Sequence, residues 1–290
     1  MAAPVELLLT WLRRQVPPAS MAWLDGAMAE SGADRKLFLS ISLVPRKLGK
    51  DDLTLTEEDL RQADQARPGW RPAGWSVDQA ARLALLLEAG LGERFAGVLD
   101  QLCRTGDVGE LVTFYRGLPL YPDPAAHLAR AREGMRTNMK AVFEAVAHDN
   151  PYPVEQFDEE AWNQMVVKAL FIGSSLDRIQ GLDHRRNADL AHMLCDYAHE
   201  RWAAHRPVAP ELWRCVGPFA DRDSLLDLGK VLSSGKPEER CGAALALAEC
   251  PRPEARQLLE TAPELASAIR QGRLNWNAAA MRAAEQVGRQ

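Results

Sequence analysis

The sequence predicts an all-α fold, and three observations support this prediction. Apolar residues recur at intervals of three or four along nearly every segment. Strictly alternating runs of β-branched residues, which would indicate strands, are missing. Ser, Thr or Asp precedes an acidic first turn at several predicted helix starts, and Gly follows several predicted helix ends. We therefore expect a superhelix of helical hairpins without a β-sheet.

The predicted helix starts follow Thr56, Ser76, Asp158 and Asp221. Between the first two of these, the stretch "RPGWRPAGW" at 67–75 combines two prolines, two glycines and two tryptophans. This composition predicts an ordered loop rather than a flexible linker, with the tryptophans packed on neighbouring helices.

After residue 206 the predicted helices become shorter. The stretch "PEERCGAALALAECPRPEARQLLE" predicts a helix, a proline-marked turn and a second helix, as in one unit of a HEAT-type solenoid. No clean repeat period accompanies it, so we expect only HEAT-like stacking toward the C-terminus. We interpret residues 1–290 as a single all-α domain, with N-terminal and central helices in 1–206 and short hairpins in 207–290.

The composition limits the possible partners and compartments. The chain has 290 residues, with 35 Lys and Arg against 40 Asp and Glu, so its formal net charge is −5. No block of like charges stands out, which disfavours a surface for nucleic acid or for an anionic membrane. No segment approaches the roughly 20 apolar residues of a membrane span, and Glu6 interrupts the first apolar run, unlike a secretion signal. We expect a cytoplasmic protein that does not insert into a membrane.

Metal and cofactor sites are not expected. The five cysteines are widely spaced and form no CxxC motif with partner histidines, so we interpret them as reduced thiols. His192, Asp196 and His199 share the spacing of metal ligands on a predicted helix. They lie opposite the apolar face of that helix, among other charged residues, which favours a solvated surface.

Polar residues interrupt the apolar faces of three predicted central helices, 134–147, 158–172 and 185–205. Asn138 falls on the apolar side of the first, which indicates either a capping or core asparagine or a ligand contact. The second is apolar over almost its whole circumference, although it contains Asn163, Gln164 and Lys168. An unpaired buried amide costs about 1–3 kcal/mol and an unpaired ammonium costs more. Lys168 should therefore either meet a carboxylate such as Glu144 or face a cavity filled by water or ligand.

Two long stretches of this central region resemble the EboA family. They are "RTNMKAVFEAVAHDNPYPVEQFDEEAWNQMVVKALFIG" and "RIQGLDHRRNADLAHMLCDYAHERWAAHRPVAPELWRCVG", which together cover roughly residues 134–217. The resemblance implies a bacterial gene cluster that makes or moves a small secondary metabolite, with neighbours that include a UbiA-type membrane prenyltransferase. Other neighbours resemble a TatD-type metal hydrolase, a dehydroquinate synthase, a sugar isomerase and a nucleotide pyrophosphatase. The resemblance implies no catalytic residue.

The stretch with this resemblance also contains the polar residues that the helical periodicity places inward. Cations and carboxamides inside a helical wall suit a phosphate, a carboxylate or a polyol, because such ligands need paired donors once desolvated. The candidate ligand-binding residues are Asn138, Lys140, Glu144, Asn163, Gln164, Lys168, Asp183, Arg185, Asn187 and Arg201. We expect the helical ones to converge in one polar pocket.

Three functions follow from this interpretation. The first is a non-catalytic binding or carrier protein for a polar intermediate of the pathway. The second is an enzyme, a transferase or hydrolase, that uses Glu144 or Asp183 as the acid or base. The third is a helical scaffold for other proteins of the cluster, in which the inward polar residues are structural.

The interpretation of the histidines leads to a first testable prediction. Crystals soaked in zinc should show no ion bound between His192 and His199, because these side chains are expected to face solvent. A tetrahedral ion at about 2.0–2.1 Å from both imidazoles would contradict this prediction. Anomalous scattering at the zinc edge is the measurement.

Overall fold

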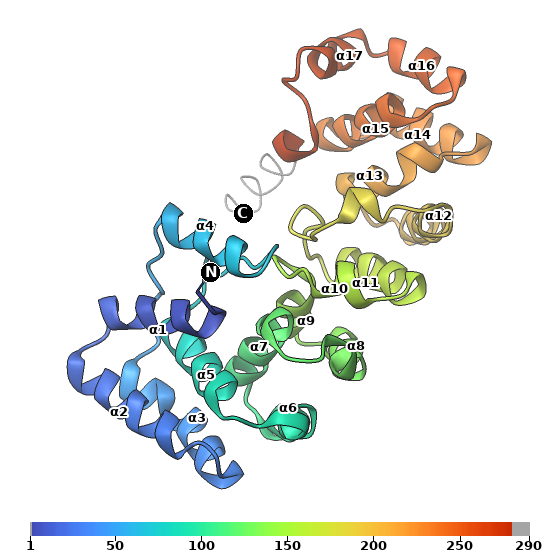
Figure 1. Ribbon diagram of the computed structural model, residues 1–290. Helices are drawn as coiled ribbons and strands as arrows, with labels where there is room; N and C mark the ends of the chain where they lie inside the picture. The colour runs from blue at the N-terminus through green and yellow to red at the C-terminus, as the bar shows by residue number, and fades with distance from the viewer. Residues whose placement is uncertain (1, 280–290) are drawn as a thin grey trace. The chain divides into compact units, whose positions relative to one another are not determined.

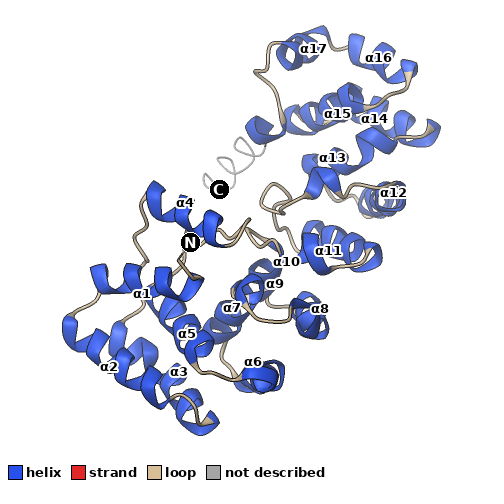
Figure 2. Ribbon diagram, viewed as in Figure 1, coloured by secondary structure: helices blue, strands red, loops and turns tan. Residues whose placement is uncertain are grey.

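A computed structural model gives the structure of residues 2–279. All regular secondary structure in this range is helical, which confirms the all-α prediction (Figure 2). An isolated antiparallel bridge pairs Asp52 with Ser76. None of the described helices combines the length and the apolar character needed to cross a membrane.

The contacts divide the chain into two compact units, residues 1–157 and 158–290. The division falls where the extended Phe157 separates two helices, α10 and α11. The sequence analysis placed a change of character at residue 207, because the helices shorten there. The boundary between the two units therefore lies about fifty residues before the point where the helices shorten. Residues 158–206 belong to the same unit as the short hairpins that follow them.

The first unit is built around helix α5. It contains α1 (Pro4–Gln15), α2 (Pro18–Glu30), α3 (Asp34–Leu48), α4 (Glu57–Ala66), α5 (Val77–Glu88), α6 (Phe95–Thr105), α7 (Val108–Arg116), α8 (Leu128–Arg136), α9 (Lys140–Ala147) and α10 (Tyr152–Gln156), with the 3-10 helices η1 (Gly92–Arg94), η2 (Leu118–Leu120) and η3 (Pro124–His127). Helices α1, α2, α3 and α7 all contact α5 (Figure 1). Nine of its twelve residues are buried as a result.

The loop at 67–75 is ordered by aromatic packing, as predicted. Trp70 and Trp75 are buried, and their ring centroids lie 6.0 Å apart. Trp11 of α1 packs against Trp70 at 5.4 Å between centroids. This cluster of indoles joins the loop to the first helix.

The second unit is a succession of helices followed by short hairpins (Figure 1). It contains α11 (Glu159–Phe171), η4 (Leu182–His184), α12 (Ala188–Ala203), η5 (Pro210–Leu212), α13 (Trp213–Val216), η6 (Gly217–Phe219), α14 (Arg222–Ser234), α15 (Pro237–Glu249), α16 (Pro253–Glu260) and α17 (Pro263–Arg270). Helix α12 contacts α11 and α13, while α15 contacts α13, α14, α16 and α17. The predicted pair separated by a proline-marked turn is confirmed as α15 and α16, and this stacking is compatible with a HEAT-like arrangement.

The predicted helix starts are confirmed. The side chains of Thr56, Asp158 and Asp221 accept hydrogen bonds from backbone N–H groups in the first turns of α4, α11 and α14, at 3.2, 2.9 and 2.8 Å. Ser76 immediately precedes α5. These caps satisfy donors that the helices themselves leave unpaired.

The expected continuous helix at 134–147 is wrong. Helix α8 ends at Arg136 and α9 begins at Lys140, with an extended backbone at Thr137. The Thr137 hydroxyl accepts a hydrogen bond from the Met139 N–H at 3.2 Å, which favours a turn over a helix here. Asn138 lies in this break and is exposed, so helical periodicity does not place it inward.

The crossing of α7, α8 and α9 leads to a second prediction. A Cβ atom on Gly134 would lie 2.6 Å from the Tyr115 ring and 2.9 Å from Val146 Cγ2. In Gly134→Ala, this overlap should lower the free energy of unfolding by about 1–3 kcal/mol. The higher helix propensity of alanine should offset up to about 1 kcal/mol of this loss. Gly26→Ala in α2 is the matched control, because no atom lies within 4 Å of its added Cβ.

Urea and thermal unfolding of both variants measure this difference. Gly26→Ala should leave the midpoint unchanged or raise it. Equal midpoints for the two variants would show that the close approach at Gly134 is not a constraint.

Candidate functional site

Two asparagines of the second unit form a reciprocal amide pair between α11 and α12. The Asn163 Nδ2 donates to Asn187 Oδ1 at 3.2 Å, and the Asn187 Nδ2 donates to Asn163 Oδ1 at 2.9 Å. Asn187 also caps α12, because its Oδ1 accepts from the Leu190 N–H at 2.8 Å. Its Nδ2 donates to the Arg185 carbonyl at 3.2 Å. The pair therefore fixes both the start of α12 and the backbone of Arg185.

Arg185 lies over an aromatic ring beside this pair. Its guanidinium carbon is 4.7 Å from the centroid of Trp162, which is fully buried in α11. Burial lowers the pKa of Arg185, while the charges of Glu159 and Asp158 oppose this change. The structure thus places a half-buried cation on an indole, next to two carboxamides.

The other two polar residues of α11 have different surroundings. Gln164 is exposed, and its Nε2 donates to Glu160 Oε1 at 3.2 Å. Lys168 is half-buried, and burial lowers its pKa. Lys168 lies five residues beyond Asn163, a rise of about 7.5 Å along the helix. It also lies about 140° around the helix from Asn163, so it is not part of the amide pair.

Asp183 belongs to an ion pair at the end of the loop that precedes α12. Its two carboxylate oxygens accept hydrogen bonds from Arg214 Nε at 2.8 Å and Arg214 Nη2 at 2.6 Å. Burial alone would raise the pKa of Asp183, but its hydrogen bonds with Arg214 and the Arg214 and Arg186 charges lower it. A carboxylate held in this way is poorly suited to donate a proton near neutral pH.

Glu211 is a half-buried carboxylate that the sequence analysis missed. Its Oε2 accepts a hydrogen bond from the Leu176 N–H at 2.9 Å, and the Ser175 hydroxyl lies 3.4 Å away. Burial raises the pKa of Glu211, although these hydrogen bonds and the Arg214 charge oppose the change. The sequence contained a signal, because Glu211 stands in the otherwise apolar run "PVAPELW".

Arg201 does not share a pocket with Asn187, contrary to the expectation. The two residues stand at opposite ends of α12, and fourteen residues of helix correspond to about 21 Å. The Arg201 Nε donates to the Pro207 carbonyl at 3.0 Å. Arg201 therefore secures the turn after α12.

The remaining three candidates belong to the first unit. Asn138 and Lys140 are exposed and Glu144 is half-buried, with 3.7 Å between Lys140 Nζ and Glu144 Oε1. The structure thus brings Asn163, Arg185 and Asn187 together, with Lys168 on the same helix. A binding role for any candidate residue stays a prediction.

The buried asparagine of the 138–153 stretch is Asn150 rather than Asn138. Its Nδ2 donates to the carbonyls of Tyr115 and Ala145, each at 3.0 Å, and its Oδ1 accepts from the Tyr152 N–H at 3.0 Å. Those carbonyls lie in the last turns of α7 and α9, where the helix itself provides no N–H four residues further on. Asn150 is thus a structural residue that joins two helix ends.

The histidines of α12 are exposed. His192 pairs loosely with Asp196 at 3.8 Å, and His199 Nε2 lies 2.6 Å from Asp227 Oδ2 on α14. Over residues 2–279, no group of three or more His, Cys, Asp or Glu side chains has an arrangement that could hold a metal ion.

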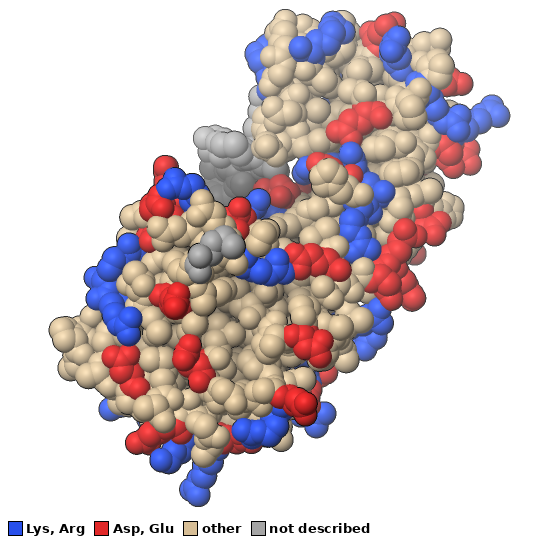
Figure 3. Space-filling model, viewed as in Figure 1, with Lys and Arg blue, Asp and Glu red and all other residues tan. Residues whose placement is uncertain are grey.

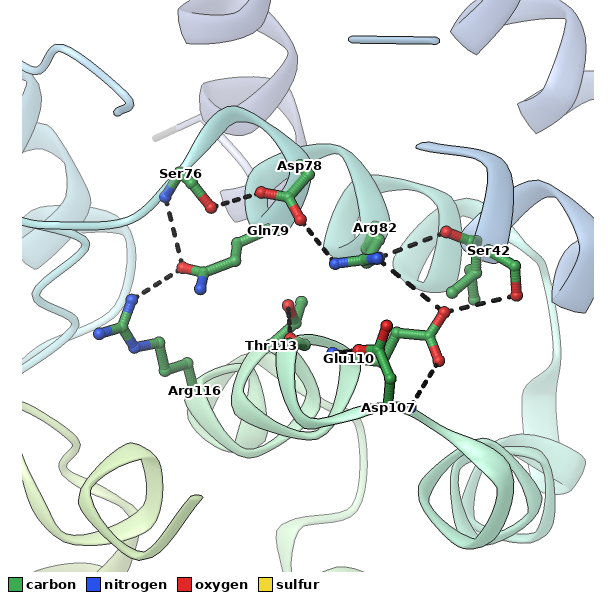
Figure 4. Close-up of polar contacts among 11 residues, drawn as sticks. Ser42, Ser76, Asp78, Gln79, Arg82, Asp107, Glu110, Thr113 and Arg116 are labelled. Atoms are coloured by element: carbon green, nitrogen blue, oxygen red, sulfur yellow. Dashed lines mark hydrogen bonds and ion pairs between the residues drawn. The ribbon is translucent and has the colours of Figure 1, made fainter. Parts of the chain in front are cut away.

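A buried arginine forms the centre of a polar cluster in the first unit (Figure 4). Arg82 of α5 has a side chain that is 2% exposed, and its Nη1 donates to Asp78 Oδ2 at 2.6 Å. Its Nε donates to the Ile41 carbonyl of α3 at 3.3 Å. Pro45 supplies no N–H to that carbonyl, so the proline frees the acceptor that Arg82 uses.

The cluster extends from Arg82 to α7. Arg82 Nη2 lies 3.9 Å from Glu110 Oε1, to which the Ser42 hydroxyl also donates at 3.4 Å. On the other side, Arg116 Nη1 donates to Gln79 Oε1 at 2.7 Å (Figure 4). The cluster therefore joins α3, α5 and α7 through side chains of both charges. The sequence signal for it was Asp78 and Arg82, four residues apart on a largely apolar helix.

Charges of both signs are intermixed over the face of the molecule in Figure 3. The visible face shows no broad basic surface of the kind that binds a nucleic-acid backbone.

The Arg82 cluster leads to a third prediction. Asp78→Asn should lower the free energy of unfolding by up to about 3–5 kcal/mol, because it removes the nearer of the two carboxylates beside the buried Arg82 charge and leaves only Glu110 at 3.9 Å. The matched control is Glu30→Gln, which removes a carboxylate from an exposed pair with Lys36 and should cost no more than about 1 kcal/mol. Urea unfolding monitored by circular dichroism measures both, and equal losses would contradict a special role for the buried pair.

Comparison with known proteins adds the family. No curated protein and no solved structure gives a significant match to the chain. The family model described as "Metabolite traffic protein EboA" matches residues 4–217, which include Trp162, Arg185 and both members of the amide pair. Since this match covers well over half of the 290 residues, the chain belongs to the EboA family.

Proposed function

We propose that this protein is a non-catalytic binding or carrier protein for a polar small molecule of a secondary-metabolite pathway. The molecule would carry a phosphate, a carboxylate or a polyol. The description of the family as metabolite traffic proteins supports a carrier. The observation that carries the proposal is the half-buried Arg185 guanidinium above the buried Trp162 ring.

The chemistry of a stacked guanidinium supports this choice of ligand. Stacking uses the flat face of the group, so its five N–H donors point outward along the edges. Burial lowers the pKa of Arg185, which indicates that the cation has lost part of its hydration. Hydrogen bonds from a partly desolvated cation to an anion or a diol are stronger than those in water.

The neighbouring groups fit the same ligand class. The amide pair of Asn163 and Asn187 holds the Arg185 backbone in place through the 3.2 Å bond to its carbonyl. Lys168 lies on the same helix as Trp162 and is half-buried, and burial lowers its pKa. A guanidinium held on a fixed backbone is suited to bind and release a polar molecule.

The enzyme remains a second candidate because of Glu211. A carboxylate whose pKa is raised by burial is a common property of general acids. Its Oε2, however, already accepts the Leu176 N–H, and the lowered pKa of Asp183 argues against the acid suggested by the sequence.

The observation that favours the scaffold is the pairing of Asp183 with Arg214, which needs no ligand.

Cytoplasmic location and contact with other proteins of the cluster, including a membrane prenyltransferase, are part of the same proposal. The carrier would then take up or deliver its ligand at such partners.

A fourth prediction tests the proposal by ligand retention. The protein is purified natively from a host that carries the whole gene cluster, and native mass spectrometry records the retained small molecules. The parent should retain a polar molecule that Arg185→Met and Lys168→Met lose, with melting temperatures close to that of the parent. Arg256→Met on α16 is the control, because Arg256 is exposed and lies beyond the residues matched by the family.

Three results would contradict this prediction. Retention by all variants would remove Arg185 and Lys168 from the site. Unfolding of Arg185→Met and Lys168→Met would favour the structural explanation and the scaffold. Conversion of the retained molecule into a product by the purified protein would favour the enzyme.

A further inference from the structure

The loop between α11 and α12 carries Arg185 and is long for a connection within one compact unit. It runs from residue 172 to residue 187 and includes η4. Gly173 and Gly181 have positive φ angles of 67° and 74°, which favour glycine at these turns. A loop of this length needs contacts outside itself to hold one conformation.

The beginning of this loop is held by Glu211 of η5. The Glu211 carboxylate accepts the Leu176 N–H at 2.9 Å. The Ser175 hydroxyl, which also donates to Asp177, lies 3.4 Å from the same oxygen. Glu211 thus satisfies a backbone donor that no helix provides for.

The end of this loop is held by Arg214, three residues after Glu211. Arg214 makes two hydrogen bonds to Asp183, at 2.8 and 2.6 Å. Its own carbonyl accepts a hydrogen bond from Arg186 Nη1 at 2.8 Å. Arg214 therefore contacts Asp183, two residues before Arg185, and Arg186, the residue after it.

We propose that Glu211 and Arg214 are positioning residues for the Arg185 site, and that they keep the Arg185 guanidinium over Trp162 by holding the two ends of the loop. This inference rests on the proposed function. It assigns the η5–α13 segment, residues 210–216, a role in ligand binding without any contact to the ligand.

The nature of the Glu211 contact determines which variants test the proposal. Its role is to accept a hydrogen bond from the Leu176 N–H, and a glutamine oxygen can do the same. Burial raises the pKa of Glu211, so the site does not favour the charge. Glu211→Gln should therefore preserve the loop, whereas Glu211→Leu should release it.

The fifth prediction uses two measurements that do not need the ligand. In Glu211→Leu, deuterium uptake at 174–187 should increase, and phenylglyoxal labelling of Arg185, quantified by peptide mass spectrometry, should rise several-fold. Arg256 provides the internal reference, since its labelling should not change. In Glu211→Gln, deuterium uptake and labelling should both equal the parent values. This difference between the two variants would show that the hydrogen bond to the Leu176 N–H, and not a general loss of stability, accounts for the effect of Glu211→Leu.

Unchanged labelling and uptake in Glu211→Leu would overturn the proposal, as would a Glu211→Gln variant that behaves like Glu211→Leu. If Glu211→Leu fails to fold, Asp183→Asn tests the other end of the loop, because it weakens the pair with Arg214. In that variant, the labelling of Arg185 should increase while the melting temperature stays equal to that of the parent. Unchanged labelling would again overturn the proposal. Absence of a retained ligand would count against the proposed function but would leave these measurements unaffected.

Discussion

Helices satisfy most of their own backbone hydrogen bonds, so a polar side chain buried between them depends on the few backbone groups that the helices leave unpaired. Arg82 donates to the Ile41 carbonyl, which Pro45 frees inside α3. Asn150 donates to carbonyls in the last turns of α7 and α9. These two side chains therefore bind carbonyls where helices end or are interrupted, and they join the helices concerned.

The same constraint shapes the candidate site. Asn187 accepts the Leu190 N–H at the start of α12, and Glu211 accepts the Leu176 N–H in the loop before it. With these backbone groups satisfied, the loop presents Arg185 on a fixed backbone above Trp162. The binding chemistry that we propose depends on contacts whose first role is structural.

The all-α fold could be predicted because it depends on local signals. The caps at Thr56, Asp158 and Asp221 and the apolar spacing are properties of short segments, and they do not require knowledge of which helices touch. The break at Thr137 was missed because the apolar spacing continues across it. A helical wheel assumes that the helix is continuous, so it assigned the exposed Asn138 to an inner face.

The site could be predicted only in part for a related reason. The wheels correctly turned Asn163 inward, but they give no position along the helix axis, and so they grouped Asn187 with the distant Arg201. The contact of Glu211 with the Leu176 N–H spans 35 residues and that of Arg82 with the Ile41 carbonyl spans 41, and periodicity carries no information over such separations. Single charges in apolar runs were the available signal, since an isolated buried charge is too costly to lack a partner.

The region beyond the family match contributes to the same loop. Arg186 Nη1 lies 2.5 Å from Glu249 Oε2 at the end of α15, and the Trp276 Nε1 donates to the other oxygen of that carboxylate at 2.6 Å. The family match ends at residue 217, so both Glu249 and Trp276 lie outside it. The C-terminal hairpins therefore do more than extend the stack of helices. Through Glu249 they contact the residue next to Arg185, which makes the hairpins part of the structure that holds the proposed site.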